Sequence, residues 1–174
     1  MSGSLIKLQE IDATGTTEAT LVGIDSTYDV YVLEFLKVQP TTNNKNMFFR
    51  VTVSTPTAGT PDVSANYDAS SRILRTSGAY SSTKTLNGTQ HTVAASLTNT
   101  AGHKANGKMY LFNFANASEY SYGTNETSSF PGGLLGYQGG WVHTVQQACD
   151  GVTHYLESGD TFASGIFRLY GLKK

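Results

Sequence analysis

Strand-forming residues are densest at residues 28–38 (YDVYVLEFLKV), a stretch rich in β-branched and aromatic side chains that contains neither Gly nor Pro. Such side chains pack well on a pleated surface. Alternate residues from Tyr31 to Phe35 form one apolar face, and the opposite face also starts apolar, with Val30 and Val32. A strand that is apolar on both faces is usually central and covered on both sides. We therefore expect this stretch to be the middle of the first sheet.

Shorter stretches of the same kind recur along the chain, separated by clusters of turn-forming residues. Helical periodicity is not evident between them. Together they predict an all-β protein, an antiparallel β-sandwich of the jelly-roll type, with about eight to ten strands and little helix. The polar stretch 77–88 and the Gly-rich run 132–140 predict loops. Further strands are expected at residues 19–23, 47–53, 91–97, 108–114, 120–124, 141–145, 152–156 and 166–172.

The length of 174 residues is enough for one domain with a sizeable hydrophobic core and is too short for two stable domains. We expect residues 18–174 to form a single β-sandwich domain and residues 1–17 to be an N-terminal arm or anchor segment. The last predicted strand, 166–172, is too apolar for a loose tail, and a terminal strand stays ordered when it is paired inside a sheet. We expect it to pair with 28–38 or with 108–114.

Charged residues make up 14% of the chain, well below the roughly 25% of an average soluble protein. Ser, Thr, Asn and Gly take their place, which is typical of extracellular or particle-borne β proteins. The net charge is −1 and the basic residues are scattered singly, which argues against a nucleic-acid partner and a polybasic membrane surface. The sequence has no run of eighteen apolar residues and no signal-peptide hydrophobic region, so we expect neither membrane insertion nor a signal peptide.

Residue types that carry chemistry are present, but their spacing indicates no enzyme. Cys149 is the only cysteine, and a lone cysteine is most often a small buried hydrophobe. His143 and His154 would be neighbours if their strands paired, but two histidines without a cysteine or a carboxylate pair make a poor metal site. The Gly-rich run lacks the ending of a phosphate loop, and no Gly-x-Ser-x-Gly nucleophile elbow occurs. We expect no catalytic residue, no metal and no cofactor.

Four aromatic residues form the candidate ligand or interface site: Tyr120, Tyr122, Tyr137 and Trp141. Together they could form a platform on which sugar rings stack. The alternative is that they pack in the core or at a subunit contact. The position of Trp141 separates these readings, because a buried Trp141 favours a scaffolding role, whereas a Trp141 exposed beside Tyr137 in a groove favours binding.

Five segments, spread over nearly the whole chain, carry a distinctive combination of motifs. They are 23–32 (GIDSTYDVYV), 65–68 (ANYD), 106–114 (NGKMYLFNF), 135–140 (LGYQGG) and 159–172 (GDTFASGIFRLYGL). In these segments the chain resembles a family of small β-sandwich virion structural proteins of marine tailed bacteriophages, especially those of cyanobacteria and related hosts. The resemblance implies a place on the virion as capsid decoration, collar or tail fibre, and it carries over no catalytic residue.

The resemblance and the composition together predict a non-enzymatic structural protein of the virion surface, made in the host cytoplasm. The 10 Tyr and 8 Phe residues predict subunit contacts, where Tyr is favoured. We expect a homo-oligomer, a trimer, that docks on other virion proteins such as the major capsid or tail proteins. Two alternatives stay open. One is a receptor-binding module that attaches to host-surface glycan through aromatic stacking, and the other is a glycan hydrolase, for which the Glu residues show no paired spacing.

Overall fold

The computed structural model describes residues 4–54 and 57–173. Their backbone forms antiparallel strands joined by turns, with one 3₁₀ turn, η1 (Glu157–Gly159), within the described ranges. The strands are β1 (Ser4–Asp12), β2 (Glu18–Val22), β3 (Val30–Pro40), β4 (Lys45–Val53), β5 (Thr60–Pro61), β6 (Tyr67–Arg75), β7 (Tyr80–Gly88), β8 (His91–Leu97), β9 (Ala105–Phe112), β10 (Ser121–Ser129), β11 (Leu135–His143), β12 (Gly151–Leu156) and β13 (Phe162–Lys173).

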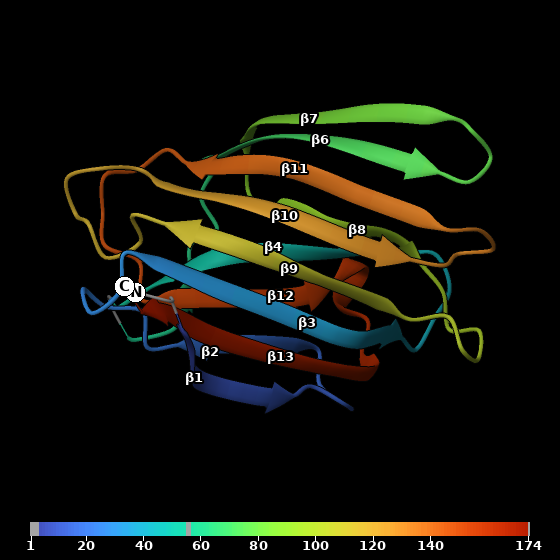
Figure 1. Ribbon diagram of the computed structural model, residues 1–174, viewed down its shortest axis with the longest axis horizontal. Helices are drawn as coiled ribbons and strands as arrows, with labels where there is room; N and C mark the ends of the chain where they lie inside the picture. The colour runs from blue at the N-terminus through green and yellow to red at the C-terminus, as the bar shows by residue number, and fades with distance from the viewer. Residues whose placement is uncertain (1–3, 55–56, 174) are drawn as a thin grey trace.

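The strands form two antiparallel sheets that pack against each other (Figure 1). The large sheet has eight strands in the order β1-β13-β3-β9-β10-β11-β6-β7, and the small sheet has five, β2-β12-β4-β5 with β8 also paired to β4. In Figure 1 the large sheet crosses the view from β7 at the top to β1 at the bottom, and the small sheet lies behind it. This arrangement confirms the prediction of an all-β antiparallel sandwich with little helix.

Each sheet contains one group of four neighbouring strands. The two groups are β1-β13-β3-β9 in the large sheet and β2-β12-β4-β8 in the small one. The strands β10, β11, β6 and β7 extend the large sheet beyond β9. The jelly-roll connectivity of the two groups stays a prediction.

Strand β3 lies inside the large sheet, between β13 and β9, as the pattern of residues 28–38 predicts. Its side chains Tyr31, Leu33 and Phe35 point into the core and are buried. On its other face Val32 is buried as well. The start of β3 is therefore apolar on both faces, although only the inner face lies against the other sheet; on the outer face Val32 lies between Tyr170 and Tyr110 of the neighbouring strands.

The C-terminal strand β13 pairs with β3 on one side and with β1 on the other. This confirms the prediction that residues 166–172 pair with an internal strand. Of the two partners that were expected, 28–38 and 108–114, the structure shows 28–38. Residues 1–3 of the segment 1–17, expected to be an arm or anchor, lie outside the described residues, and its described part includes β1, the edge strand of the large sheet.

The described residues form thirteen strands, more than the eight to ten expected. The prediction of a loop at 77–88 is wrong, because most of this stretch is β7. As an edge strand, β7 is largely exposed and its Ser and Thr residues show no apolar alternation. The loop prediction for 132–140 is wrong from Leu135 onward, where β11 begins. Its glycines allow close packing, since a Cβ on Gly139 would lie 2.2 Å from the Ser71 hydroxyl oxygen.

The core fills the space between the inner faces of the two sheets. The large sheet contributes Phe35, Phe167 and Trp141, and the small sheet contributes Phe49 and Val152. The rings of Phe49 and Trp141 are 4.5 Å apart between centroids, so the sheets interlock there. Each of these fully buried apolar side chains contributes roughly 1.5–3 kcal/mol relative to an exposed one.

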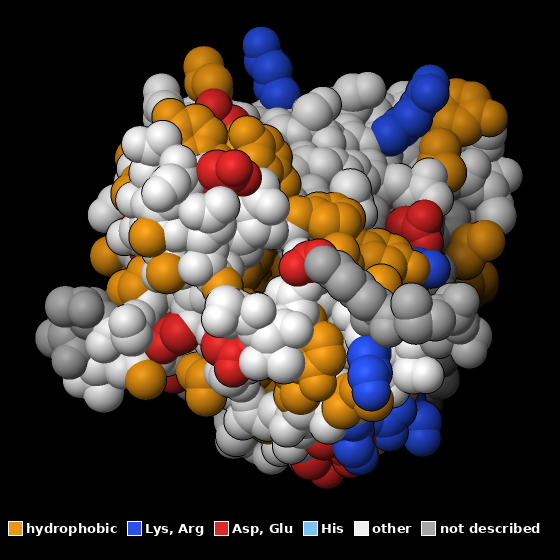
Figure 2. Space-filling model, turned by 60° about the vertical axis from the view of Figure 1, so that its left-hand side comes forward, with side chains coloured by type: hydrophobic (Ala, Val, Ile, Leu, Met, Phe, Trp, Pro, Cys, Tyr) orange, Lys and Arg blue, Asp and Glu red, His pale blue; other side chains and the backbone are white. Residues whose placement is uncertain are grey.

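The surface is polar but sparsely charged, as the composition indicates. On the face shown in Figure 2, hydrophobic side chains reach the surface in several groups between uncharged polar ones. The described residues include exposed large apolar side chains on both edge strands of the large sheet, Leu5, Ile6 and Leu8 on β1 and Tyr80 and Leu86 on β7. Exposed apolar groups of this kind are candidates for contact with a partner.

Candidate functional site

The outer face of the large sheet, which points away from the small sheet, carries the candidate site. Strand β10 illustrates its composition because burial alternates strictly along it. Tyr122, Thr124, Glu126 and Ser128 point outward and are exposed, while the residues between them point inward. Neighbouring strands pair in register with β10, so outward side chains at the same level form rows across the sheet.

One row, which we call the charged row, alternates in sign across five neighbouring strands from β1 to β10. Within these five strands, each charged residue lies directly opposite one of the other sign on the next strand. Such cross-strand pairs stabilise a sheet. In spatial order the row consists of Glu10, Arg168, Glu34, Lys108, Glu126, Gln138 and Arg72.

Side-chain contacts hold the charged row in place. The Nε of Arg168 donates a hydrogen bond to Glu10 Oε2 at 2.7 Å, and Lys108 Nζ lies 3.4 Å from Glu126 Oε2. The hydrogen bond from Arg168 lowers the pKa of Glu10, and the interaction with Glu126 raises the pKa of Lys108. Because these pairs face solvent, they order the face more than they stabilise the fold.

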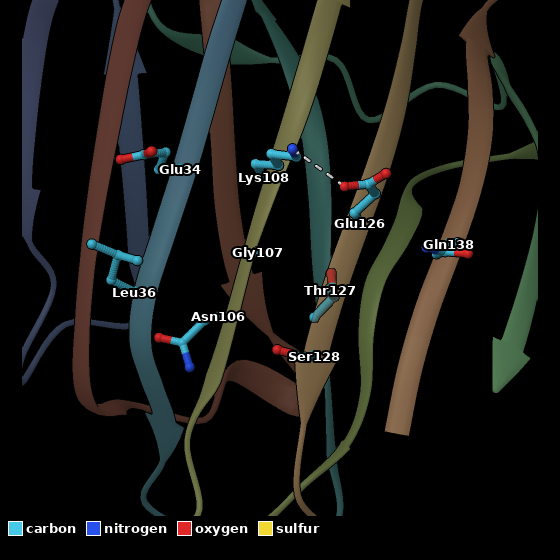
Figure 3. Close-up of a pocket in the computed structure, with 9 residues that line it drawn as sticks. All are labelled: Glu34, Leu36, Asn106, Gly107, Lys108, Glu126, Thr127, Ser128 and Gln138. Atoms are coloured by element: carbon cyan, nitrogen blue, oxygen red, sulfur yellow. Dashed lines mark ion pairs between the residues drawn. The ribbon is translucent and has the colours of Figure 1, made fainter. Parts of the chain in front are cut away.

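A shallow groove of about 440 Å³ lies along the charged row (Figure 3). Figure 3 shows the ion pair of Lys108 and Glu126 across β9 and β10, with Glu34 on the other side of Lys108. The short side chains of Asn106 and Ser128 lie further along the same two strands. The groove is thus lined by paired charges, amides and hydroxyls, which are suited to hydrogen bonds with a polar partner.

The groove brings together two carboxylates, Glu34 and Glu126, that the sequence did not predict to be neighbours. They are two strands apart, so their Cα atoms are separated by roughly 10 Å. Two carboxylates across a cleft are the residue set of glycoside hydrolysis. In this groove, however, Glu126 pairs with Lys108, and Glu34 Oε2 accepts a hydrogen bond from the Tyr170 hydroxyl at 3.1 Å. Their contacts are those of members of a charged row, whereas a glycosidase holds its acid in an apolar pocket.

A second hollow, which we call the apolar depression, lies further along the outer face and measures about 550 Å³. It lies where β6, β9, β10 and β11 run side by side. In the row formed by Thr124, Gly140 and Ser70, the glycine leaves a gap between two small side chains. The residues around this gap include Phe112, Tyr122, Val142, Asp68, Ser70 and Thr124.

The structure separates the four aromatic residues predicted to form one site. Trp141 is only 3% exposed and packs on Phe49 in the core, and Tyr137 is also buried. Tyr120 and Tyr122 are exposed, and Tyr122 borders the apolar depression. Trp141 and Tyr137 therefore act as core residues, and a ligand on the surface would meet Tyr122.

Three of the four histidines are buried: His91, His143 and His154. His91 Nε2 lies 2.9 Å from Asn125 Oδ1, whereas neither ring nitrogen of His154 has a hydrogen-bond partner among the described residues. Burial lowers the pKa of His91 to about 4 and the pKa of His154 to about 3, so both rings are neutral at pH 7. His143 and His154 belong to different sheets, so their strands do not pair.

Asp62 ties the chain before β6 to the end of β11. Its carboxylate accepts a hydrogen bond from the Ser64 backbone N–H at 2.8 Å and lies 2.7 Å from His143 Nε2. Burial alone would raise the pKa of Asp62, but the hydrogen bonds from Ser64, His143 and Asn66 outweigh it and lower the pKa to about 2. The contacts of this carboxylate are those of a structural group that stays ionised.

Cys149 is buried beneath β10, as expected for a small core hydrophobe. Its Sγ lies 3.6 Å from the Ser121 hydroxyl oxygen. Burial raises the pKa of the thiol to about 11. Because the thiolate is the reactive form of cysteine, this side chain is poorly suited to nucleophilic chemistry.

Comparison with known proteins identifies no relative of this chain. No family model, no curated protein and no solved structure matches the chain. Within residues 4–54 and 57–173, no group of three His, Cys, Asp or Glu residues could hold a metal ion. The same part of the chain has no helix that is long and apolar enough to cross a membrane.

Proposed function

We propose that this protein is a non-enzymatic structural subunit of the surface of a tailed-phage virion, which assembles as a homo-oligomer and docks on other virion proteins. The observation that carries the proposal is the edge strand β1. Its large apolar side chains Leu5, Ile6 and Leu8 are 48%, 40% and 37% exposed. Clusters of exposed apolar side chains mark interaction surfaces in soluble proteins.

The backbone of β1 supports the same proposal. In the described sheet β1 pairs only with β13, so its other side presents N–H and C=O groups that another strand can meet. The pairing register shifts between Lys7 and Gln9, which makes Leu8 the extra residue of a β-bulge. Bulges at sheet edges redirect side chains. A partner that approaches β1 meets an open edge and apolar side chains together.

The opposite edge of the large sheet supports a closed oligomer. Tyr80 and Leu86 on β7 are exposed large side chains, and Lys84 in the middle of the strand opposes uncontrolled strand pairing. Two different edges that contact each other between subunits generate a ring when the rotation closes. A trimer in which β1 of one subunit meets β7 of the next satisfies this geometry.

We also infer that the sandwich is a jelly roll, with β1-β13-β3-β9 facing β2-β12-β4-β8. Along the chain, β1, β3, β9 and β13 lie in the large sheet and β2, β4, β8 and β12 in the small one. In this assignment, β5–β7 and β10–β11 are insertions. Jelly rolls occur in viral capsid proteins and in lectins. At the level of fold analogy, this agrees with the resemblance to virion proteins.

The proposal is tested by measuring the mass of the protein in solution with light scattering. The wild type should have about three times its chain mass of 18.7 kDa, about 56 kDa. The triple variant Leu5→Thr, Ile6→Thr, Leu8→Thr keeps β-branched strand formers on β1 but removes the apolar contact, so it should be a monomer. Val63→Thr, which changes an exposed apolar residue elsewhere, should leave the mass unchanged. A triple variant with the mass of the wild-type oligomer, or a monomeric wild type, would contradict the proposal.

A further inference from the structure

We infer that the apolar depression on the outer face binds a neutral sugar ring, such as a hexose residue of a surface glycan. The inference goes beyond the proposed structural role and does not depend on it. It rests on the floor, the apolar wall and the polar rim of the depression, all built from described residues of β6, β9, β10 and β11.

The floor of the depression is open because residue 140 is a glycine, although the fold has room for a side chain at this position. A Cβ on Gly140 would have its nearest contact at 3.6 Å, the carbonyl oxygen of Gly123, which is an ordinary van der Waals distance. The φ angle of Gly140 is not in the left-handed region that favours glycine. By contrast, Gly139 could not carry a Cβ without a clash. Gly140 therefore leaves space that a larger residue could fill without strain.

The wall of the depression is aromatic and aliphatic. Tyr122 lies directly opposite Phe112 on one neighbouring strand and opposite Val142 on the other. Tyr122 is 45% exposed, so part of its surface remains in contact with water. A pyranose ring has one face of C–H groups, which packs well on the electron-rich face of an aromatic ring.

The rim of the depression is polar and carries a negative but no positive charge among the lining residues. Asp68 lies at a register shift between β6 and β7, and its Oδ1 accepts the backbone N–H of Asn87 at 2.7 Å. This hydrogen bond fixes the carboxylate beside the outward side chains of Ser70 and Thr124. Hydroxyl groups of a ligand can donate charge-assisted hydrogen bonds to such a carboxylate.

Together these features define the chemical class of the ligand. The absence of a lining cation disfavours an anionic ligand, and the carboxylate and hydroxyls disfavour a purely apolar one. A neutral sugar combines an apolar face with several hydroxyl donors. The volume of about 550 Å³ lies in the range of about 300–1,000 Å³ that is usual for small-molecule sites.

The test is an NMR titration of the ¹⁵N-labelled full chain with methyl glycosides of glucose, galactose, mannose and N-acetylglucosamine. At least one of them should shift the amide resonances of Tyr122 and Gly140. The variants Gly140→Val, which fills the floor, and Tyr122→Ala, which removes the wall, should each weaken binding by about tenfold or more, equal to about 1.4 kcal/mol.

Two matched controls separate loss of the site from loss of the fold. Gly136→Val adds the same side chain to the outer face of the same strand, where the nearest contact of its Cβ is an ordinary 3.5 Å to Leu74. Tyr120→Ala removes an exposed tyrosine that does not line the depression. Both should bind within about twofold of the wild type, well under the tenfold step of 1.4 kcal/mol.

Two results would overturn the inference. One is that no glycoside shifts the resonances of the depression at the highest concentration used, including the case in which tetramethylammonium, a cationic probe, shifts them instead. The other is that Gly140→Val binds as the wild type does. The oligomeric mass is measured on the same samples, so failure of the sugar site is distinguishable from failure of the proposed assembly.

Discussion

Replacing His154 by leucine should stabilise the protein, because the fold buries this imidazole without satisfying it. His154 lies in β12. The centroid of its ring is 6.1 Å from that of Phe35, 5.7 Å from that of Phe49 and 5.2 Å from that of Phe167. Both ring nitrogens lack a hydrogen-bond partner among the described residues. Leucine is similar in size and has no polar atom, so it should fit among these rings.

The size of the effect depends on pH. At pH 7 the gain is the removal of an unsatisfied buried polar group, about 1–3 kcal/mol. The pKa of His154 is lowered from 6.5 to about 3, so below pH 6.5 the unfolded chain binds a proton that the folded protein does not. The contribution of His154 to the free energy of unfolding is therefore constant above pH 6.5, and it falls as the pH drops from 6.5 toward 3. At pH 5, which is 1.5 units below 6.5, the loss is about 2 kcal/mol.

The assay is urea unfolding at pH 7 and pH 5, followed by the fluorescence of Trp141, the only tryptophan in the chain. His154→Leu should raise the free energy of unfolding by about 1–3 kcal/mol at pH 7 and by about 2 kcal/mol more at pH 5. His91, whose pKa is lowered in the same direction, is present in both proteins, so its contribution cancels.

The control is His103→Leu, which changes a half-buried imidazole whose Nδ1 lies 3.0 Å from the Thr98 hydroxyl oxygen. It should not raise stability, because it removes a satisfied polar group. The reasoning is refuted if His154→Leu lowers the free energy of unfolding at pH 7, or if its effect is the same at pH 5 and pH 7.

Three further predictions concern the core. A chain that ends at Gly165 loses most of β13, including two fully buried apolar side chains worth about 3–6 kcal/mol, so it should be insoluble; a soluble, folded product would be evidence against this. Gly123→Ala should lower the free energy of unfolding by about 1–3 kcal/mol, because its Cβ would lie 2.4 Å from the Trp141 ring, and an unchanged urea midpoint would exclude the clash. Cys149 should react with a thiol reagent at pH 8 only after unfolding, because burial raises its pKa to about 11; rapid labelling of the native protein would disagree.

The strands that could be predicted from the sequence are those whose buried positions carry apolar residues. Strands β3 and β13 are apolar enough on both faces to be identified as strands, and β3 is one of the two partners that were expected for β13. Strand β7 is an exposed edge, and its Ser and Thr residues are equally at home in a loop. The glycines of β11 suggest a turn, and only the neighbouring strands show why they are there: Gly139 lies against Ser71, where no Cβ fits. Edges and close approaches of backbone depend on neighbours that are distant in the chain.

The candidate site was harder to predict because it depends on strand register. Glu34, Lys108 and Glu126 come from three separate strands, and only the pairing of β3, β9 and β10 places them in one row. The aromatic residues depend on register as well, because a shift of one residue moves a side chain to the other face of a sheet. Trp141 and Tyr122 lie on opposite faces for this reason. In β10 the buried positions are Ser121, Gly123, Asn125, Thr127 and Ser129, so no apolar alternation in the sequence showed which residues point outward.

The central claim is that β1 is an assembly edge, and amide hydrogen exchange of Ser4–Asp12 tests it most directly. The measurement compares the wild type at high concentration with the triple variant Leu5→Thr, Ile6→Thr, Leu8→Thr. If β1 meets another subunit, its outward amides should exchange more slowly in the wild type and lose this protection in the variant or on dilution. Exchange of β1 at the same rate in both proteins and at all concentrations would contradict the claim.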